Sequence, residues 1–168
     1  MRVGLVQMTS NDQPEQNRTA VLDFVREAAA GGAGFVLTPE VTNCISSDRV
    51  HQRDVLRHEA EDETLAALQA EAKTLGIWLL IGSLALLTRD EDGRFANRSF
   101  LIDPAGQIVA RYDKIHMFDV TISATESYRE SAGYRPGGRA VLAQTPFAAL
   151  GLSVCYDLRF PHLYRSLA

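Results

Sequence analysis

The chain has 168 residues, of which 17 are Lys or Arg and 21 are Asp or Glu, so its formal net charge is −4. Hydrophobic residues make up 46% and charged residues 23%, which is ordinary for a folded domain and excludes disordered, collagen-like and disulfide-rich classes. The acidic balance and the scattered basic residues argue against nucleic acid as a partner, because phosphate binding needs clustered Lys and Arg.

Three features bear on location. The longest apolar stretch, residues 77–87, is interrupted by Gly82 and Ser83 and is too short to cross a bilayer. The first seven residues lead directly into alternating apolar residues, without the hydrophobic region of a signal peptide. Cys44 and Cys155 make no disulfide framework, which is typical of a reducing compartment. The sequence therefore predicts a cytoplasmic protein with no membrane partner.

The first half of the chain alternates apolar strands with amphipathic helices. Asp12 and Glu15 have the spacing of a capping box, and Pro14 suits a first helical turn, where its missing N–H costs nothing. The polar stretch between the second strand and the second helix is predicted to be a loop. The elements expected here are a strand at 3–8, a helix ended by Gly31-Gly32, a strand at 35–37, a helix from Leu65 closed by Gly76, and a buried strand at 77–81.

The second half is typical of antiparallel strands joined by turns. Residues 113–138 show little periodicity and many polar, Gly and Pro residues, which predicts a long loop of the kind that often carries function. A helix is predicted from Leu158 onward. The strands expected in this half lie at 84–88, 97–103, 108–112, 141–142 and 148–154.

This order of elements predicts an α/β or α+β layered fold in which helices cover sheets. Residues 1–168 contain no repeat and no linker, so they are assigned to one domain. The last predicted helix reaches Ala168 without a Gly, Asn or Pro to end it. We therefore expect the chain to be the N-terminal, incomplete part of that domain.

Three reactive side chains follow predicted strands: Glu40 after Pro39, Lys114, and Cys155 just before a helix. The ends of strands in layered α/β folds are where sites are assembled. A thiol at the start of a helix lies near N–H groups that favour the thiolate. Acyl transfer also needs a base, an oxyanion stabiliser and a proton donor, roles open to a carboxylate, an ammonium and the backbone N–H of Tyr156.

These residues lie in the segments Leu37-Thr38-Pro39-Glu40, Arg111-Tyr112-Asp113-Lys114-Ile115-His116 and Cys155-Tyr156-Asp157-Leu158-Arg159-Phe160-Pro161. In order, the three segments resemble the three signature segments of the nitrilase superfamily of carbon–nitrogen hydrolases. Residues 6–8, the segment Arg129-Glu130-Ser131 and the later Pro136-Gly137 also look like that family, so the resemblance covers essentially the whole chain. It is most similar to the Nit branch of amidases, which includes deaminated glutathione amidase and ω-amidase.

The resemblance implies a four-layer αββα sandwich, here ending after the nucleophile helix, and a Glu-Lys-Cys triad. Glu40 would be the general base, Lys114 the oxyanion stabiliser and Cys155 the nucleophile, while Glu130 would support Lys114 and position the substrate. The thiolate would attack the amide carbon and release ammonia, and water would hydrolyse the thioester, with no metal and no cofactor. The substrate would be a small linear amide, such as deaminated glutathione or an ω-amide of a dicarboxylic acid.

Each of these residues has a structural alternative. Cys155 alone would more often be a small buried hydrophobe. Glu40 could be a solvated turn carboxylate, and Lys114 could form a surface pair with its neighbour Asp113. Glu126 lies close to Glu130 in the same predicted loop, so either glutamate could be the one that supports Lys114.

Tyr156 and Arg159 lie in the first turn after Cys155, where their side chains could reach a pocket. Arg159 could bind a substrate carboxylate, or it could form an internal ion pair with Asp157. His116 invites a Cys–His dyad, but the family resemblance makes it a supporting residue.

Other functions remain open at this point. The same triad could hydrolyse a nitrile or an N-carbamoyl compound, or the chain could be a non-catalytic fragment or a module that works only with a partner. A homo-oligomer is expected from the family, through a surface that includes residues 158–168. His51 and His58 are seven residues apart and do not share a helix face, so no metal site is predicted.

Overall fold

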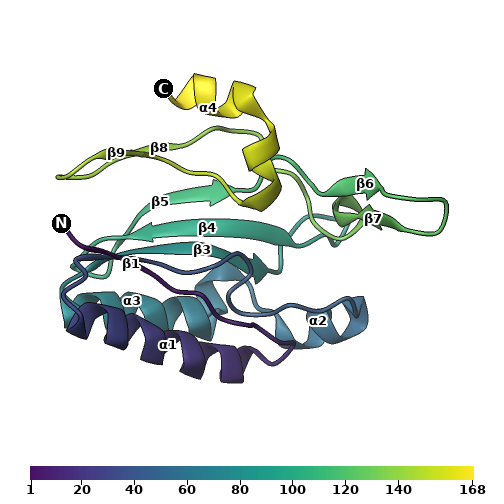
Figure 1. Cartoon of the computed structure of the whole chain (residues 1–168). Helices are drawn as coiled ribbons and strands as arrows, with labels where there is room; N and C mark the ends of the chain where they lie inside the picture. Colours follow the sequence, from purple (N-terminus) through teal and green to yellow (C-terminus); the bar gives the residue numbers. More distant parts are fainter.

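The computed structural model describes residues 1–168 as one mixed sheet, two small hairpins and flanking helices (Figure 1). The helices are α1 (Pro14–Ala30), α2 (Arg49–Val55), α3 (Glu63–Leu75) and α4 (Pro161–Leu167), with 3-10 helices η1 (Glu59–Glu61), η2 (Glu130–Ala132) and η3 (Cys155–Arg159). The strands are β1 (Val3–Leu5), β2 (Phe35–Leu37), β3 (Trp78–Leu86), β4 (Ala96–Ile102), β5 (Ile108–Asp113), β6 (Asp119–Thr121), β7 (Ser127–Arg129), β8 (Leu142–Gln144) and β9 (Ala149–Gly151). No helix is long and apolar enough to cross a bilayer.

The central sheet has five strands in the order β1-β2-β3-β4-β5. β1, β2 and β3 are parallel, whereas β4 is antiparallel to both of its neighbours. β5 therefore runs in the same direction as β2 and β3. As a result, the chain leaves β2 toward Glu40 and leaves β5 toward Lys114 at the same end of the sheet.

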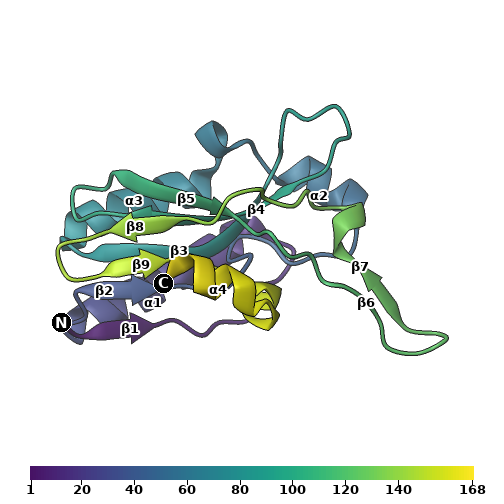
Figure 2. The same cartoon turned by 90° about the horizontal axis from the view of Figure 1, so that it is seen from above.

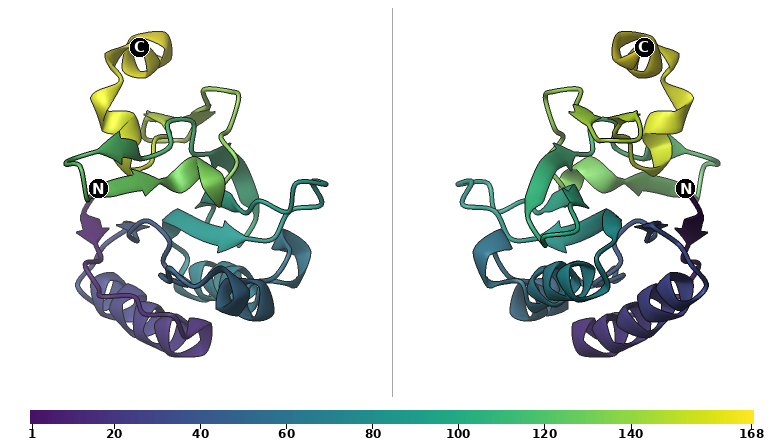
Figure 3. Two further views of the ribbon diagram at one scale, coloured as in Figure 1. Left: turned by 90° about the vertical axis from the view of Figure 1, so that its right-hand side faces the viewer. Right: turned by 90° about the vertical axis from the view of Figure 1, so that its left-hand side faces the viewer.

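Helices α1 and α3 cover one face of this sheet (Figure 3). The main core lies between these helices and the sheet and is built from buried apolar side chains at helical and strand spacing. Its members include Val21 and Val25 of α1, Leu65, Leu68 and Ala72 of α3, and Val36, Leu79, Ile81 and Phe100 of the sheet.

The β8–β9 hairpin packs on the opposite face, and α4 lies beyond it (Figures 1 and 3). Ala143 of β8 packs with Phe35 and Leu101 of the sheet, and Leu152 and Val154 pack with Tyr112. Leu167 of α4 lies against the backbone of Gly151. The layers therefore follow the order helices, sheet, hairpin, helix, and the predicted α/β class with helices on a mixed sheet is confirmed.

The β6–β7 hairpin projects beyond the end of the sheet (Figure 2). It lies within the stretch 113–138, which the sequence predicted to be a long loop. The prediction was wrong because each strand has only three residues, too few to show a period of two.

Helix boundaries also differ from the predicted ones. The predicted capping box is absent: α1 has Gln13 at its N-cap with no side-chain bond, and Asp12 instead accepts from the amide of Gln13. α2 was missed because seven residues are too few for a clear helical period, although Asp48 caps it by accepting two backbone N–H groups. The helix predicted from Leu158 is divided, because Pro161 starts a new helix after η3.

The predicted strands at 77–81 and 84–88 are one strand, β3, with a bulge at Gly82 and Ser83. Thr38 and Pro39 lie directly over the bulge: a Cβ at Gly82 would be 2.2 Å from the Thr38 carbonyl oxygen. Ser83 donates its backbone N–H to Pro39, and its hydroxyl accepts from the N–H of Val41 at 2.8 Å. The bulge thus anchors the segment that carries Glu40.

We expect Gly82→Ala to lower the free energy of unfolding by about 1–3 kcal/mol, because the added methyl group would overlap backbone atoms that cannot move aside. Gly138→Ala is the matched control, since a Cβ there meets nothing within 4 Å. Urea denaturation of both variants measures the difference. Equal midpoints for the two variants would contradict the role given to the bulge.

Candidate active site

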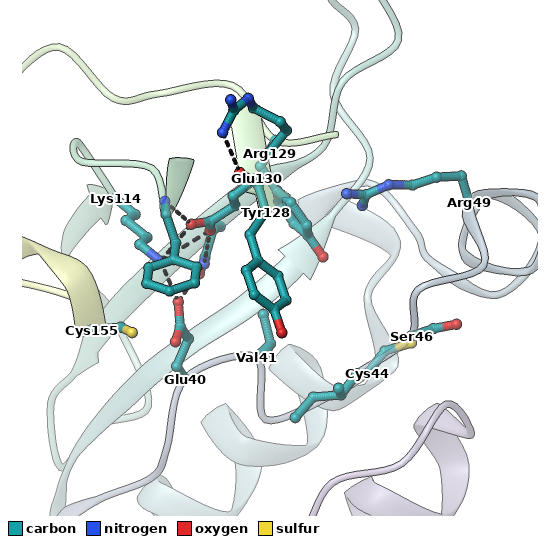
Figure 4. A pocket seen from close by; sticks show the side chains of 14 residues that line it. Glu40, Val41, Cys44, Ser46, Arg49, Lys114, Tyr128, Arg129, Glu130 and Cys155 are labelled. Carbon is teal, nitrogen blue, oxygen red and sulfur yellow. Dashed lines mark hydrogen bonds and ion pairs between the residues drawn. The ribbon is translucent and has the colours of Figure 1, made fainter. Parts of the chain in front are cut away.

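A cavity of about 380 Å³ opens where the chain leaves β2 and β5 (Figure 4). Four of the residues predicted from the sequence line it: Glu40, Lys114, Glu130 and Cys155. They come from the turn after β2, the end of β5, the start of η2 and the start of η3. The fold thus brings together side chains that are up to 115 residues apart in the sequence.

Lys114 lies at the centre of the polar network, and its side chain is only 2% exposed. Its Nζ donates to Glu40 Oε1 at 2.8 Å and to the two carboxylate oxygens of Glu130 at 3.0 and 2.9 Å. These bonds use all three donors of the ammonium group. Lys114 therefore does not pair with Asp113, whose carboxylate instead binds Arg98 and Arg135.

The ammonium stays charged in this setting. Burial alone would lower the pKa of Lys114, but the hydrogen bonds and negative charges of Glu40 and Glu130 outweigh it and raise that pKa above its usual value. A fixed positive charge therefore lies beside the cavity.

Glu40 has one oxygen that is engaged and one that is not. Its Oε1 accepts from Lys114 and, at 2.8 Å, from the side-chain amide of Asn97. Neither Lys114 nor Asn97 binds its Oε2. Two donors on one oxygen fix the carboxylate while the other oxygen can accept a proton.

Asn97 of β4 was missed by the sequence reasoning. It is buried, it lines the cavity, and its amide nitrogen also lies 3.4 Å from Glu130 Oε1. Its own oxygen is buried without a partner. An Asn within an apolar strand was the one available signal, because a buried amide needs polar neighbours.

Glu130 connects the site to the β6–β7 hairpin. Its Oε2 accepts the backbone N–H of Phe118 at 2.6 Å as well as a bond from Lys114. The preceding residues of β7, Tyr128 and Arg129, also line the cavity. Glu126, the alternative acid, instead accepts from the hydroxyl of Tyr128 on the exposed hairpin.

Cys155 is exposed at the cavity and has a left-handed backbone, with φ of 47°. Val41, next to Glu40, is the other non-glycine residue with positive φ, at 42°. For a β-branched residue this conformation is strained, and such strain is concentrated at functional sites. No sequence pattern signals it.

The Cys155 thiol is not a preformed thiolate. Burial and the negative charge of Glu40 raise its pKa to about 11, and the positive charge of Lys114 only partly offsets them. The sequence reasoning expected helix N–H groups to favour the thiolate. That expectation was wrong because η3 is a single short 3-10 helix. Burial and the carboxylate of Glu40 have the larger effect on the pKa of the thiol.

Asp157 connects the loop after β5 to the turn at Cys155. It is fully buried and accepts from the Tyr112 hydroxyl at 2.6 Å and from the backbone N–H of Val154 at 2.9 Å. His116 pairs with it through Nδ1 at 2.6 Å and stacks on Phe160. His116 does not line the cavity.

The structure does not bring Tyr156 and Arg159 into the cavity lining. Tyr156 packs edge-on against Phe118, which does line it. Arg159 is exposed and forms no ion pair, and Asp157 is occupied by other partners. Besides Lys114, the cationic side chains on the wall are Arg49 and Arg129. No group of three or more His, Cys, Asp or Glu side chains is arranged to hold a metal ion.

Comparisons with known proteins agree on one family. A sequence model described as Carbon-nitrogen hydrolase matches residues 2–168. The deaminated glutathione amidase of Yersinia enterocolitica is 36% identical, over 98% of this chain and 57% of that protein. Omega-amidase NIT2 of Homo sapiens is 30% identical, over 96% and 57%. The chain spans little more than half the length of these curated relatives.

Solved structures show the same likeness. The structure of the C. elegans NitFhit protein superposes with a TM-score of 0.86 at 31% identity, covering 96% of this chain and 39% of that one. An amidase from Nesterenkonia superposes with a TM-score of 0.79 at 25% identity, covering 99% and 59%.

We expect alkylation of Cys155 by iodoacetamide to rise with pH up to about 11, well above the ordinary thiol range near pH 8.5. Glu40→Gln removes a negative charge beside the sulfur, so the midpoint moves to lower pH without reaching the ordinary value, since burial remains. Mass spectrometry of the labelled peptide, in a Cys44→Ala background, measures the rate at each pH. A midpoint near 8.5 in the parent chain would refute the described environment of the thiol.

Proposed function

The chain belongs to the carbon–nitrogen hydrolase family, and we propose that it provides the catalytic residues of an amidase that hydrolyses small linear amides to carboxylate and ammonia. One observation carries the proposal: a buried ammonium, Lys114, bound by two carboxylates beside the exposed thiol of Cys155 on one cavity. Buried charge of this kind is retained where chemistry requires it.

Glu40 is the general base in this mechanism. Because the Cys155 thiol is protonated near neutral pH, attack on an amide carbon needs a group that removes the proton in the same step. The unengaged Oε2 of Glu40 can receive it, while Lys114 and Asn97 hold Oε1. The sulfur then forms the bond to the amide carbon, and negative charge moves to the amide oxygen.

Lys114 stabilises that oxyanion by its charge. The backbone N–H of Tyr156 is a second donor, because it lies in the first turn of η3, where N–H groups have no partner within the helix. Glu40 returns its proton to the departing nitrogen. The carbon–nitrogen bond breaks, ammonia leaves, and the acyl group remains bound to Cys155 as a thioester. A water molecule, deprotonated by Glu40, hydrolyses the thioester and releases the carboxylate product and the thiol.

Deaminated glutathione and ω-amides of dicarboxylic acids are the substrates we favour, by analogy with the names of the relatives. A nitrile or an N-carbamoyl compound is the alternative substrate for the same residues. A partner-dependent module without activity of its own is the alternative function. We also propose that the complete domain is an αββα sandwich, in which β8 and β9 belong to the second sheet and α4 to the outer layer.

We expect the chain to release ammonia from small amides, and Cys155→Ala to abolish the release. Glu40→Gln lowers kcat/KM by about 10²–10⁴-fold, the usual contribution of general acid–base catalysis. Ammonia is measured over a panel that holds deaminated glutathione, a dicarboxylic acid ω-amide, a nitrile and an N-carbamoyl amino acid.

Cys44→Ala is the control for loss of a thiol. Cys44 also lines the cavity, but its side chain is buried in an apolar cluster and its one hydrogen bond is to the Asp12 carbonyl, not to the Lys114 network. Release that survives in Cys155→Ala would rule out Cys155 as nucleophile. Preference for the nitrile or the N-carbamoyl compound would replace the amidase assignment, and no release from any compound would favour the inactive module.

A homo-oligomer that associates through residues 158–168 is a further expectation. Leu158 is 71% exposed and Tyr164 of α4 is 36% exposed, so apolar side chains are accessible there. Light scattering is expected to give a mass above one chain, and Leu158→Glu to reduce it. A monodisperse monomer would contradict the expectation.

A further inference from the structure

Arg49, the first residue of α2, places a positive charge on the cavity wall that no carboxylate neutralises. Its Nη1 donates to the neutral amide oxygen of Gln52 at 2.8 Å, and it forms no ion pair. In Figure 4 it lies across the cavity from Glu40 and Cys155. A guanidinium has five N–H donors, so most of those of Arg49 have no partner in the protein.

The guanidinium is held by buried neighbours rather than left free in solvent. Gln52 is buried, and its amide nitrogen donates to the Tyr134 hydroxyl at 3.1 Å. The guanidinium carbon lies 5.1 Å from the centre of the Tyr134 ring and 5.7 Å from that of Phe95. Cation–π contacts and a buried hydrogen bond therefore fix its position in advance of any ligand.

Gly133 makes room for this arrangement. A Cβ at position 133 would lie 2.0 Å from the guanidinium carbon and from Nη2 of Arg49. The φ of Gly133 is −119°, which any residue can adopt, so the backbone does not require glycine there. Glycine is present at this position because any side chain would overlap the guanidinium group of Arg49.

The charges around the cavity show that Arg49 is available for a ligand. The two lining carboxylates, Glu40 and Glu130, are both bound to Lys114. The third lining cation, Arg129, donates to oxygen atoms within its own hairpin. The wall that bears Arg49 therefore has an excess of positive charge, which favours an anion.

We propose that Arg49 is the residue that selects substrates bearing a carboxylate at the end remote from the amide. The inference rests on the proposed amidase function, in which the amide carbon lies at Cys155. The planar guanidinium binds the carboxylate through its unused donors, and this contact orients the amide toward the thiol.

A covalent probe tests this without relying on amide turnover. N-bromoacetyl glycine, β-alanine and γ-aminobutyrate are each compared with the corresponding carboxamide. In every case the Cys155 sulfur forms a bond to carbon and bromide leaves, so the two reagents of a pair differ in charge at the far end. Saturation kinetics followed by mass spectrometry give the rate for each, and the ratio within a pair cancels the reactivity of the thiol itself.

We expect at least one chain length to show a carboxylate preference of about ten- to a hundredfold, the range of one charge-assisted hydrogen-bonded contact. Arg49→Gln reduces that ratio to about one while the carboxamide still reacts. Gly133→Ala also reduces it, because the methyl group displaces the guanidinium. Arg139→Gln is the matched control, since it removes an exposed positive charge that lies outside this cavity and leaves the ratio unchanged.

The outcomes separate this inference from the proposed function. No carboxylate preference at any length, or a preference that survives Arg49→Gln, overturns the inference even if ammonia is released. A preference that Arg49→Gln removes supports the inference, whether or not the chain releases ammonia. The absence of ammonia release from every amide would refute the amidase assignment and leave this inference standing.

Discussion

The burial of the Lys114 ammonium is the constraint on which the rest of the site depends. Moving such an ion out of water costs several kcal/mol, and removing one partner of a buried pair costs about 3–5 kcal/mol. The cost is offset here because Glu40 and Glu130 occupy all three donors of the ammonium. The turn after β2, the end of β5 and the start of η2 must therefore meet at one point, or the charge could not be buried.

Close backbone approaches maintain this meeting point. A Cβ at Gly137 would lie 2.2 Å from the carbonyl oxygen of Asp113, and the N–H of Gly137 donates to the Lys114 carbonyl at 2.7 Å. Gly82 likewise allows the backbone of Thr38 and Pro39, which leads to Glu40, to lie against β3. The position of each charged side chain is thus set by its backbone as well as by its ionic partner, which limits the rearrangement open to the free protein.

The sequence was sufficient to predict the layered α/β class and the candidates Glu40, Lys114 and Cys155, because residues that follow apolar strands and short motifs are local signals, whereas Glu130 came from the family resemblance alone. It did not predict the features that depend on distant contacts. Asn97 has no signal of its own beyond its place in an apolar strand, and the strained φ of Val41 depends on the bulge in β3. Arg159 was chosen from its nearness in sequence to Cys155, whereas the cavity takes Arg49, which lies over a hundred residues earlier.

The cavity has opposite electrostatic character at its two ends. At the reacting end, one ammonium and two carboxylates leave an excess of negative charge, which adds to burial in raising the pKa of the Cys155 thiol and disfavours an anionic group there. At the far wall, Arg49 has no acidic partner. An amide that carries a carboxylate is therefore repelled in one orientation and attracted in the other. Charge placement alone would direct its neutral amide toward the thiol before any bond to sulfur forms.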